Sequence, residues 1–489
     1  MSIYNPWWVA GAEAFDGLPG FRRDLYEAFC LDVARLPQII SVTGPRRVGK
    51  STLLKQCIQK LIQDNGAAQA GRLLYFTFDE PALYIPGFDA DRFFNDLVSE
   101  FAVLAKDGPV FLFLDEIQKF PRWELYLKKY HDLNTPVRFV ISGSASAPIF
   151  RKSLESLLGR IKTYRMLPFS FRESLCLQVG KMEAGRIAGI IGNELRRKSA
   201  PKQLVGWMDF FLRHSEDGLI TDIDGGNTSF TLPYGMLAEF LQRYFYEGGF
   251  PEVWTMPDLL AKQAYLYQNQ VERVIFEDLL IAAEFRKPEL MRRFYLGLLQ
   301  HPGMETNLSR LSMEIGIGKA SIDNYFPLLE ATDLVWRLQK YSGARNSAKS
   351  GNFKTYLVDL AVRNAVLKIT PQTLANDESQ LGAYAENMIA NHLRLWPGLV
   401  ELAYFRERNN ELDFIVDLGH TRVGIEVKYR NQPALKDAER SALLAKELGC
   451  EAFILVGKSA QEEKWKTRLA SVSGLPVAVI PLVYFAWLF

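Results

Sequence analysis

The sequence has few of the residues that bind metals through sulfur or nitrogen. Its 489 residues include four cysteines and five histidines, and both types are scattered along the chain. No CxxC pair is present, which argues against a zinc cluster or a disulfide framework. This cysteine usage is typical of a protein that folds in a reducing cytoplasm.

An excess of positive charge is also missing. The chain has 58 Lys and Arg against 56 Asp and Glu, a formal net charge of +2. A protein that coats nucleic acid without sequence preference needs a strongly basic surface, so that class is excluded. Any contact with nucleic acid has to come from local patches such as Arg196-Arg197-Lys198.

Neither end of the chain has the usual form of a targeting or membrane segment. The first residues lack the basic stretch and apolar core of a signal peptide. Residues 475–489 form an apolar run, but a membrane span needs roughly 18 to 20 residues, and Pro476 and Pro481 interrupt the run. A tail anchor is one alternative. We favour a buried last strand and a tucked tail in a cytoplasmic protein without membrane contact.

The length of 489 residues predicts two to four domains, and the pattern of apolar residues predicts an α/β protein. The first third alternates short apolar runs with helical patterns, as βαβ units do. Strands are predicted there at 39–42, 73–78, 110–114 and 137–142, with helices at 24–36, 50–63 and 90–105. A second α/β region contains a strand at 355–358, helices at 360–368, 380–395 and 434–448, a hairpin at 411–430, and strands near 452–456 and 477–483.

A phosphate-binding loop follows the first predicted strand. The stretch fits GxxxxGK[ST] and opens the helix at 50–63, which is the context that the motif requires. Its glycines allow backbone N–H groups to surround an anion, and the helix amino end adds partial positive charge. Lys50 would reach the β- and γ-phosphates, and the Ser51 hydroxyl would bind Mg²⁺. The predicted nucleotide ligands are Gly44, Pro45, Arg46, Arg47, Val48, Gly49, Lys50, Ser51 and Thr52.

An acidic pair ends the apolar strand at 110–114. Such a strand is buried on both faces, and ligands bind at the carboxyl edge of open α/β sheets. Asp115 would hold Mg²⁺, and Glu116 would polarise the attacking water. The alternative is that both acids are solvated and cap the next helix. Ser142, at the end of a further strand, would sense the γ-phosphate or the water, or would only cap its strand.

These motifs together resemble the AAA-type ATPases common in archaea and bacteria. The resemblance covers 38–175 and includes Leu114-Asp-Glu-Ile-Gln118 and Ile141-Ser-Gly-Ser144. It implies ATP as the nucleotide and a ring or dimer as the active form. Arg160 is the first candidate for a transition-state arginine, in its own chain or across a subunit interface, and Arg172 is the second. Both would otherwise form surface ion pairs.

The middle of the chain is predicted to be mainly helical. Residues 183–227 are polar and Gly-rich, as expected of an insertion or lid. Residues 306–340 show helix, Gly-containing turn, helix and strand, the layout of a winged helix. Such modules read DNA or pack against protein. The predicted domains are an AAA-type P-loop domain (1–175), a helical lid (176–300), a winged helix with linker (301–352) and a restriction-endonuclease-like α/β domain (353–489).

The hairpin at 411–430 contains a second acidic constellation. A two-residue turn at 419–420 places Asp413 opposite Glu426, with Cβ atoms about 5 Å apart. Period two places Lys428 on the same face as Glu426. Two facing carboxylates repel each other unless a cation lies between them, and a divalent metal with oxygen ligands fits best. The alternative is an ExK sequence on a solvated strand face.

This arrangement resembles the D…ExK site of PD-(D/E)xK nucleases, to which the last domain of many such ATPases is related. The resemblance implies that Glu386 is the helix-borne acid of the site, that Asp413 and Glu426 bind Mg²⁺ or Mn²⁺, and that Lys428 is catalytic. Gln432 would give weak support.

Two classes of function follow. The leading hypothesis is an ATPase coupled to a metal-dependent nuclease that acts on DNA, with RNA left open, in a homo-oligomer. The competing hypothesis is a nucleotide-switched regulator or scaffold whose nuclease-like domain binds nucleic acid or a partner without cleavage. A DNA-remodelling motor is a third alternative, which the lack of basic tracts makes less attractive.

Overall fold

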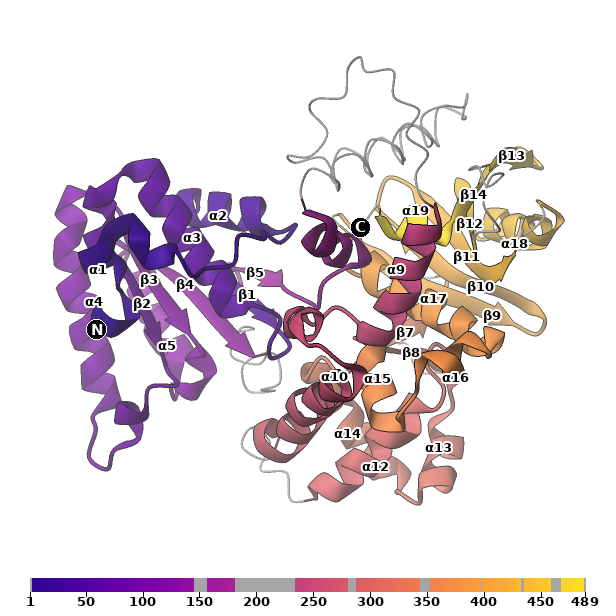
Figure 1. Cartoon of the computed structure of the whole chain (residues 1–489), viewed down its shortest axis with the longest axis horizontal. Helices are drawn as coiled ribbons and strands as arrows, with labels where there is room; N and C mark the ends of the chain where they lie inside the picture. The colour runs from indigo at the N-terminus through magenta and orange to yellow at the C-terminus, as the bar shows by residue number, and fades with distance from the viewer. Residues whose placement is uncertain are drawn as a thin grey trace, which may run out of the picture. The chain divides into compact units, whose positions relative to one another are not determined.

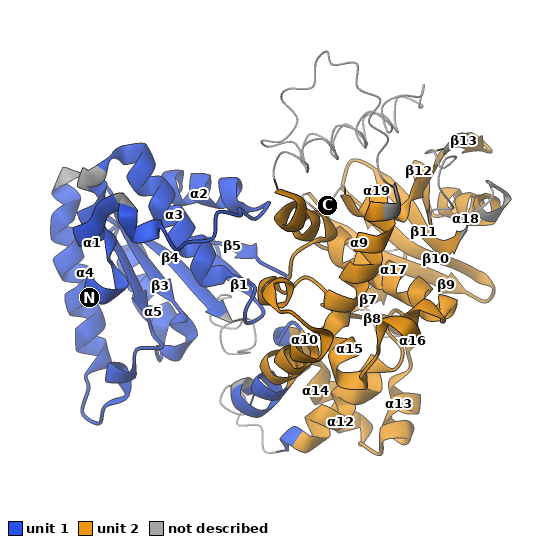
Figure 2. Cartoon of the chain, viewed as in Figure 1, with its two compact units in different colours: residues 1–167, 272–288, 331–333 blue, residues 168–271, 289–330, 334–489 orange. Residues whose placement is uncertain are grey.

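The structure is a computed structural model that describes residues 2–144, 156–180, 234–279, 287–343, 352–396, 398–431, 435–458 and 468–487. The chain forms two compact units (Figure 2). Unit 1 contains residues 1–167, 272–288 and 331–333, and unit 2 contains the rest. The predicted insertion at 183–227, the basic patch at 196–198 and Gln432 lie outside the described residues.

Unit 1 is built on a five-stranded parallel sheet (Figure 1). The strand order is β2 (Leu73–Thr77), β3 (Val110–Asp115), β4 (Val137–Ser144), β1 (Ile39–Gly44) and β5 (Ile161–Arg165). The main helices are α2 (Tyr26–Arg35), α3 (Lys50–Asn65), α4 (Ala90–Val103) and α5 (Trp123–Asp132), preceded by the short α1 (Trp7–Ala10).

The core of unit 1 explains why four strands were predictable. Every residue of β1 and β3 is buried, as expected of parallel strands covered on both faces. Phe94 of α4 and Trp123 of α5 pack with Leu112 of β3 in one hydrophobic cluster. Those strands are confirmed within two residues at their ends. The edge strand β5 was missed because its residues are mostly polar and partly exposed.

Unit 2 contains a nine-stranded mixed sheet. Its strand order is β13 (Arg468–Val472), β14 (Leu475–Pro481), β12 (Ala452–Lys458), β11 (Arg422–Asn431), β10 (Asn410–Asp417), β9 (Glu401–Glu407), β7 (Val335–Lys340), β8 (Phe353–Leu357) and β6 (Glu305–Thr306). Its helices include α9 (Tyr234–Glu247), α10 (Leu259–Leu266), α12 (Pro288–Leu299), α13 (Leu308–Ile315), α14 (Lys319–Ala331), α15 (Leu360–Leu367), α16 (Pro371–Ala375), α17 (Glu378–Leu393), α18 (Leu435–Glu447) and α19 (Leu482–Trp487).

Two helices fix the hairpin region of this sheet. Ala442 and Ala445 of α18 pack against alternate residues of the strands, including Phe453 and Leu455 of β12. Helix α17 is tied to β8, since the Asn387 side chain bonds both the N–H (2.9 Å) and the carbonyl oxygen (2.8 Å) of Leu357. The residue before Asn387, the predicted site acid Glu386, is therefore positioned against β8.

The segment predicted to be a winged helix does not stand apart from the last domain. The order α12, β6, α13, α14, β7, β8 is continuous, and β7 pairs with both β8 and β9. The predicted boundary at 352/353 therefore falls between the two strands of one hairpin. The turn between α13 and α14 begins at Gly316, whose φ of 65° suits glycine.

The last described residues of the chain, 482–487, are buried. Strand β14 confirms the predicted last strand, and α19 follows it as a buried helical turn where we expected only a tail. Among the described residues, no helix has the length and apolar character needed to cross a membrane.

Candidate functional site

The loop between β1 and α3 holds the predicted phosphate ligands. Gly44 has to be glycine, because a Cβ atom there would lie 1.9 Å from the backbone oxygen of Met166. Gly49 has a φ of 96°, which glycine adopts without strain. The buried ammonium group of Lys50 donates to the backbone oxygens of Gly44 (3.0 Å) and Pro45 (2.7 Å). Both of these hydrogen bonds join the Lys50 ammonium to uncharged acceptors.

The predicted magnesium ligands lie in one hydrogen-bonded group. Asp115 ends β3 and is 3 % exposed. Its Oδ2 accepts a hydrogen bond from the Tyr75 hydroxyl at 2.5 Å, and its Oδ1 accepts one from Ser142. The Ser51 side chain also bonds Tyr75. Ser51 and Asp115 are thus linked through one hydroxyl group, and their oxygen atoms fit Mg²⁺. Sequence analysis missed Tyr75, which lies in an apolar strand without a motif.

Burial shifts the charges of this site toward neutrality. It lowers the pKa of Lys50, although Glu116 and Asp115 oppose this effect. It raises the pKa of Glu116, which Lys50 lowers in turn. Glu116 has a left-handed backbone (φ 53°), and its Oε2 accepts a hydrogen bond from Gln118 at 2.5 Å. A held carboxylate with a raised pKa suits proton transfer from water, so the predicted role of Glu116 is chemically reasonable.

Arg165 is a residue of this region that sequence analysis missed. It ends β5 opposite Thr43 of β1, at the edge where the phosphate loop begins. Its guanidinium group bonds the carboxylate of Asp333, and Arg46 of the loop pairs with Glu277 at 3.8 Å. The polar pattern of β5 carried no strand signal that would have located Arg165.

Arg160 lies at the other end of the same sheet. Its backbone oxygen accepts a hydrogen bond from Ile39, the first residue of β1. Its guanidinium group donates to Asp132 through Nε (2.6 Å) and Nη2 (3.1 Å). The length of β1, about 16 Å, separates it from the phosphate loop. The structure therefore does not bring Arg160 to the ATP site of its own chain, and a role across a subunit interface stays a prediction. Arg172 is a buried residue of unit 2.

The predicted hairpin is present in unit 2. Strands β10 and β11 are antiparallel, and Phe414 pairs with Ile425, the register that a two-residue turn at 419–420 requires. The backbone N–H of Asp413 lies 3.4 Å from Oε2 of Glu426. The two predicted acids are therefore neighbours.

A β-bulge changes how Asp413 is presented. The pairing of β10 with β9 shifts between Leu412 and Ile415. The Oδ2 atom of Asp413 accepts a hydrogen bond from the N–H of Val427 at 2.9 Å. Bulges redirect side chains and are frequent beside active sites. Here the carboxylate bonds the backbone of β11, a contact that simple alternation did not predict.

A second lysine, which sequence analysis missed, joins the predicted acids. Lys354 Nζ lies 2.9 Å from Oε1 of Glu386, 3.1 Å from Oδ1 of Asp413 and 3.2 Å from Oε1 of Glu411. The Tyr356 hydroxyl also donates to Glu386 at 2.7 Å. Burial lowers the pKa of Lys354, but the surrounding groups outweigh it and raise this pKa well above its usual value.

Lys428 is paired separately. Its Nζ lies 2.5 Å from Oε1 of Glu426. Burial, with repulsion from Asp413, raises the pKa of Glu386 to about 7 and that of Glu426 to about 8. The structure thus brings together all four residues predicted for the nuclease-like site. We name the whole set the carboxylate–lysine cluster: Lys354, Glu386, Glu411, Asp413, Glu426 and Lys428.

The predicted metal ligands of this cluster are not arranged as a metal site. Within the part of the chain that the structure describes, no group of three or more His, Cys, Asp or Glu side chains is placed to hold a metal ion. The oxygens of Asp413 and Glu386 converge on Lys354 instead. The prediction that Asp413 and Glu426 bind Mg²⁺ or Mn²⁺ therefore finds no support in this geometry.

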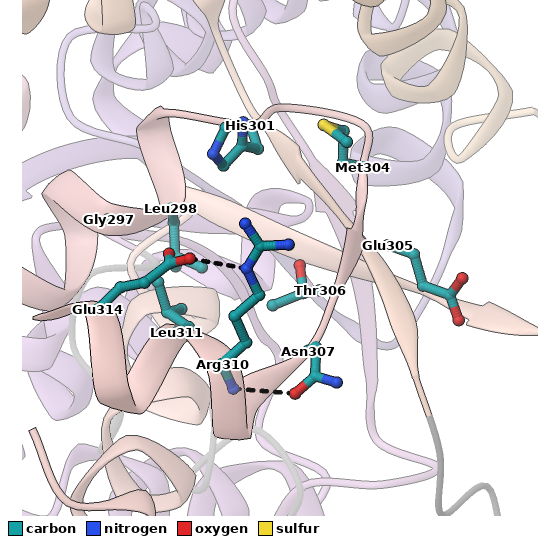
Figure 3. Close-up of a pocket in the computed structure, with 10 residues that line it drawn as sticks. All are labelled: Gly297, Leu298, His301, Met304, Glu305, Thr306, Asn307, Arg310, Leu311 and Glu314. Carbon is teal, nitrogen blue, oxygen red and sulfur yellow. Dashed lines mark hydrogen bonds and ion pairs between the residues drawn. The ribbon is translucent and has the colours of Figure 1, made fainter.

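A pocket of about 170 Å³ lies beside α13 (Figure 3). Arg310 crosses it and bonds Glu314 through Nε at 2.7 Å, and its N–H bonds the Asn307 side chain at 3.0 Å. His301 and Met304 also line it. None of the predicted catalytic or metal-binding residues lines this pocket.

Family models match three consecutive parts of the chain. Residues 36–175, which include the phosphate loop and Asp115, match the model described as AAA domain. The chain carries an AAA domain. Residues 238–373 and 381–478 match two domains of unknown function, DUF8612 and DUF4143. The five-stranded parallel sheet of unit 1 is typical of the AAA domain, whereas neither of the other descriptions names an activity.

Similar proteins extend over most of the chain. The uncharacterized protein MJ1637 of Methanocaldococcus jannaschii is 23% identical over 432 residues, 86% of this chain and 83% of that protein. The uncharacterized protein Rv2008c of Mycobacterium tuberculosis is 22% identical over 440 residues, 89% of this chain and 80% of that protein. Sequences similar to most of this chain thus occur in an archaeon and a bacterium.

Similarity to solved structures is weaker. PCH-2 of C. elegans is 13% identical, with 53% of this chain and 65% of that chain covered and a TM-score of 0.27. AMPPCP-bound DnaA from Aquifex aeolicus is 11% identical, with 63% and 86% covered and a TM-score of 0.22. Scores this low do not show a shared fold.

Proposed function

We propose that the AAA domain binds ATP with Mg²⁺ and hydrolyses it. The observation that carries this proposal is the hydrogen-bonded group of Ser51, Tyr75, Asp115 and Ser142 beside the buried Lys50. Asp115 ends β3 and Ser142 lies near the end of the neighbouring strand β4, at the edge where ligands bind in such sheets, and Ser51 lies in the first turn of α3.

Each residue has a role that its position allows. Lys50 would exchange its carbonyl partners for phosphate oxygens, and Ser51 and Asp115 would hold the metal. Mg²⁺, when bound, neutralises charge on the phosphates. Glu116 would orient the attacking water and accept its proton, and Ser142 would hold Asp115 in place through its hydrogen bond.

Turnover of ATP by the full chain tests this proposal. Glu116→Gln should bind ATP as the wild type does but hydrolyse it about a hundredfold more slowly, since a positioned base contributes about 10²–10⁴-fold. Glu100→Gln, an exposed residue of α4, is the matched control. Turnover in the wild type that needs no Mg²⁺, or unchanged turnover in Glu116→Gln, would contradict the proposal.

We further propose that unit 2 is a nuclease-like domain that binds nucleic acid under control of the ATP cycle. We favour DNA over RNA as the ligand. The meeting of Glu386, Asp413, Glu426 and Lys428 supports this. The order α12, β6, α13, α14, β7, β8 also supports a winged helix, the second element expected to contact DNA.

Two versions of unit 2 differ in cleavage. In the first, Asp413 and Glu426 hold a divalent metal and the domain cuts DNA. In the second, the domain only holds its ligand. The position of Lys354 among Glu386, Glu411 and Asp413 favours the second version, because an ammonium group already balances these acids.

Plasmid DNA incubated with the full chain separates the two versions. If the domain does not cleave, the plasmid should migrate more slowly in a gel and show no nicking with Mg²⁺ or Mn²⁺, whether or not ATP is present. Nicking that Asp413→Asn or Lys428→Ala abolishes, while ATP turnover stays unchanged, would establish the cleaving version instead. DNA that neither migrates differently nor is cut would leave a protein ligand as the partner.

Assembly into a homo-oligomer is a further part of the proposal. Arg160 lies at the surface of unit 1 in a pair with Asp132, where a neighbouring chain would reach it. Sedimentation of the chain with a non-hydrolysable ATP analogue would reveal a ring or dimer. A monomer under these conditions would remove the role of Arg160 across an interface.

A further inference from the structure

The centre of the carboxylate–lysine cluster is occupied by an amino group of the chain itself. Lys354 extends from β8, and its side chain is 3 % exposed. Three carboxylate oxygens from two other elements, α17 and β10, lie 2.9 to 3.2 Å from its Nζ. A single positive charge is therefore held at the point where Glu386, Glu411 and Asp413 converge.

The position of Lys354 is built by its strand. Its backbone pairs with Glu305 of β6, and period two places Tyr356 on the same face of β8. The Tyr356 hydroxyl bonds the same Oε1 atom of Glu386 that Lys354 bonds. The Tyr404 ring lies 5.6 Å from Nζ. One aromatic ring thus lies near the ammonium, and a tyrosine hydroxyl shares its carboxylate partner.

A divalent metal does not fit this arrangement. Mg²⁺ and Ca²⁺ need six or more oxygen ligands at about 2.0–2.6 Å. At the shared position the ion would meet the ammonium of Lys354, and two cations in a buried site repel strongly. Two further oxygens of the cluster also have partners, since Asp413 Oδ2 bonds Val427 and Glu426 Oε1 bonds Lys428.

We infer that Lys354 is the resident cation of the carboxylate–lysine cluster and takes the place that the D…ExK arrangement gives to a divalent metal. The four carboxylates of the cluster face two lysines. Removal of the Lys354 charge leaves one lysine and opens a divalent-cation site bounded by Glu386, Asp413 and Glu426. The inference rests on the proposed non-cleaving role of unit 2 and supplies its chemical cause.

Binding of Mn²⁺ to the nucleotide-free full chain, followed by electron paramagnetic resonance of the unbound ion, tests the inference. Lys354→Met, which keeps the chain length and removes the charge, should gain one site per chain at least about tenfold tighter than any site of the wild type. Lys354→Met combined with Asp413→Asn should lose that site. Mn²⁺ should also raise the melting temperature of Lys354→Met and not that of the wild type.

Lys262→Met is the matched control. Lys262 is another buried lysine of unit 2, and its Nζ lies 2.6 Å from Oε1 of Glu247, away from the cluster. This variant should bind Mn²⁺ as the wild type does. A gain of the same site in Lys262→Met would show that loss of any buried lysine creates it, and this would overturn the inference.

Two further outcomes would overturn it. One is a folded Lys354→Met that gains no Mn²⁺ site. The other is a Mn²⁺ site in the wild type that Asp413→Asn abolishes, a comparison that decides the question even where Lys354→Met does not fold. Nicking of DNA by the wild type is a separate readout, so failure of the non-cleaving proposal is distinguishable from failure of the inference.

Discussion

The AAA domain and the carboxylate–lysine cluster each contain a buried lysine, and the two lysines have opposite kinds of partner. Lys50 donates to two backbone carbonyl oxygens, whereas Lys354 contacts three carboxylates. Burial accordingly lowers the pKa of Lys50, while the pKa of Lys354 is raised well above its usual value. A lysine with neutral partners is ready for an anionic ligand, and one surrounded by acids acts as a counterion.

The largest expected effect concerns the ligand-binding lysine. Lys50→Ala should reduce ATP turnover about a thousandfold, because it removes a positioned charge from the phosphates. Lys354→Ala should leave turnover within about twofold, since it lies in unit 2. Lys60→Ala, also on α3, is the control. Steady-state phosphate release measures the turnover of all three variants. Similar losses of turnover in Lys50→Ala and Lys354→Ala would contradict the assignment of different roles to the two lysines.

Stability should show the reverse order. Lys354→Met leaves buried acids without their cation, and breaking a buried ion pair in this way costs about 3–5 kcal/mol. Lys50→Met loses two bonds to carbonyl oxygens and the attraction of Glu116 and Asp115, but it also removes the cost of burying an ammonium group, so its net destabilisation should be smaller. Hydrogen exchange of peptides from α17 and α3 would report each unit separately. Equal destabilisation of the two units would contradict the assignment of Lys354 as a counterion.

Acid should weaken unit 2 through His392 of α17. Its Nδ1 bonds the Met388 carbonyl oxygen at 2.6 Å, and Phe171 N–H donates to its Nε2 at 3.4 Å. This requires the neutral ring, and burial lowers the His392 pKa from 6.5 to about 4. The unfolded chain therefore binds the proton first, and stability falls by about 3 kcal/mol as pH drops from about 6.5 to about 4.

The His392→Gln variant tests this dependence. Its urea midpoint should change less between pH 7 and pH 4.5 than that of the wild type, as followed by exchange in α17. His420→Gln, in the exposed hairpin turn, should behave as the wild type does. An unchanged acid dependence in His392→Gln would show that other groups cause it.

The smallest effect is expected at Arg160. Its pair with Asp132 is partly exposed at the surface, and surface pairs add little stability, so Arg160→Ala should melt as the wild type does. Its ATP turnover should equal that of the wild type in dilute solution and fall behind only as rising concentration assembles the chains. Arg92→Ala, on the exposed face of α4, is the control. Equal turnover at every concentration would exclude a catalytic role for Arg160.

Local patterns carried most of what was predictable. The phosphate loop, Asp115 and the register of Phe414 with Ile425 each follow from adjacent residues and a turn length. Lys354 was not predictable in this way, because its partners Glu386 and Asp413 lie 32 and 59 residues away in the chain. A charged residue just before the apolar strand at 355–358 was the only available signal, and our predicted strand began one residue too late to include it.

Other misses have physical causes of the same kind. The edge strand β5 has no apolar run and was not predicted. Without it, the sequence could not show that Arg160 and Arg165 lie at opposite ends of the sheet. The bulge at Asp413 depends on pairing with β9, a strand that we did not predict. Nonlocal pairing therefore decided both the position of one candidate residue and the orientation of another.

The position of β8 in the chain determines where unit 2 can be truncated without loss of Lys354. Its Lys354 is separated in the chain from the helix and hairpin that carry the acids it neutralises. A fragment that starts beyond residue 357 would lack Lys354. The four carboxylates of the cluster would then repel one another, with Lys428 as the one lysine of the cluster left to balance them. The solubility, melting temperature and Ca²⁺ or Mn²⁺ affinity of such a fragment would therefore reflect the truncation and not the full chain.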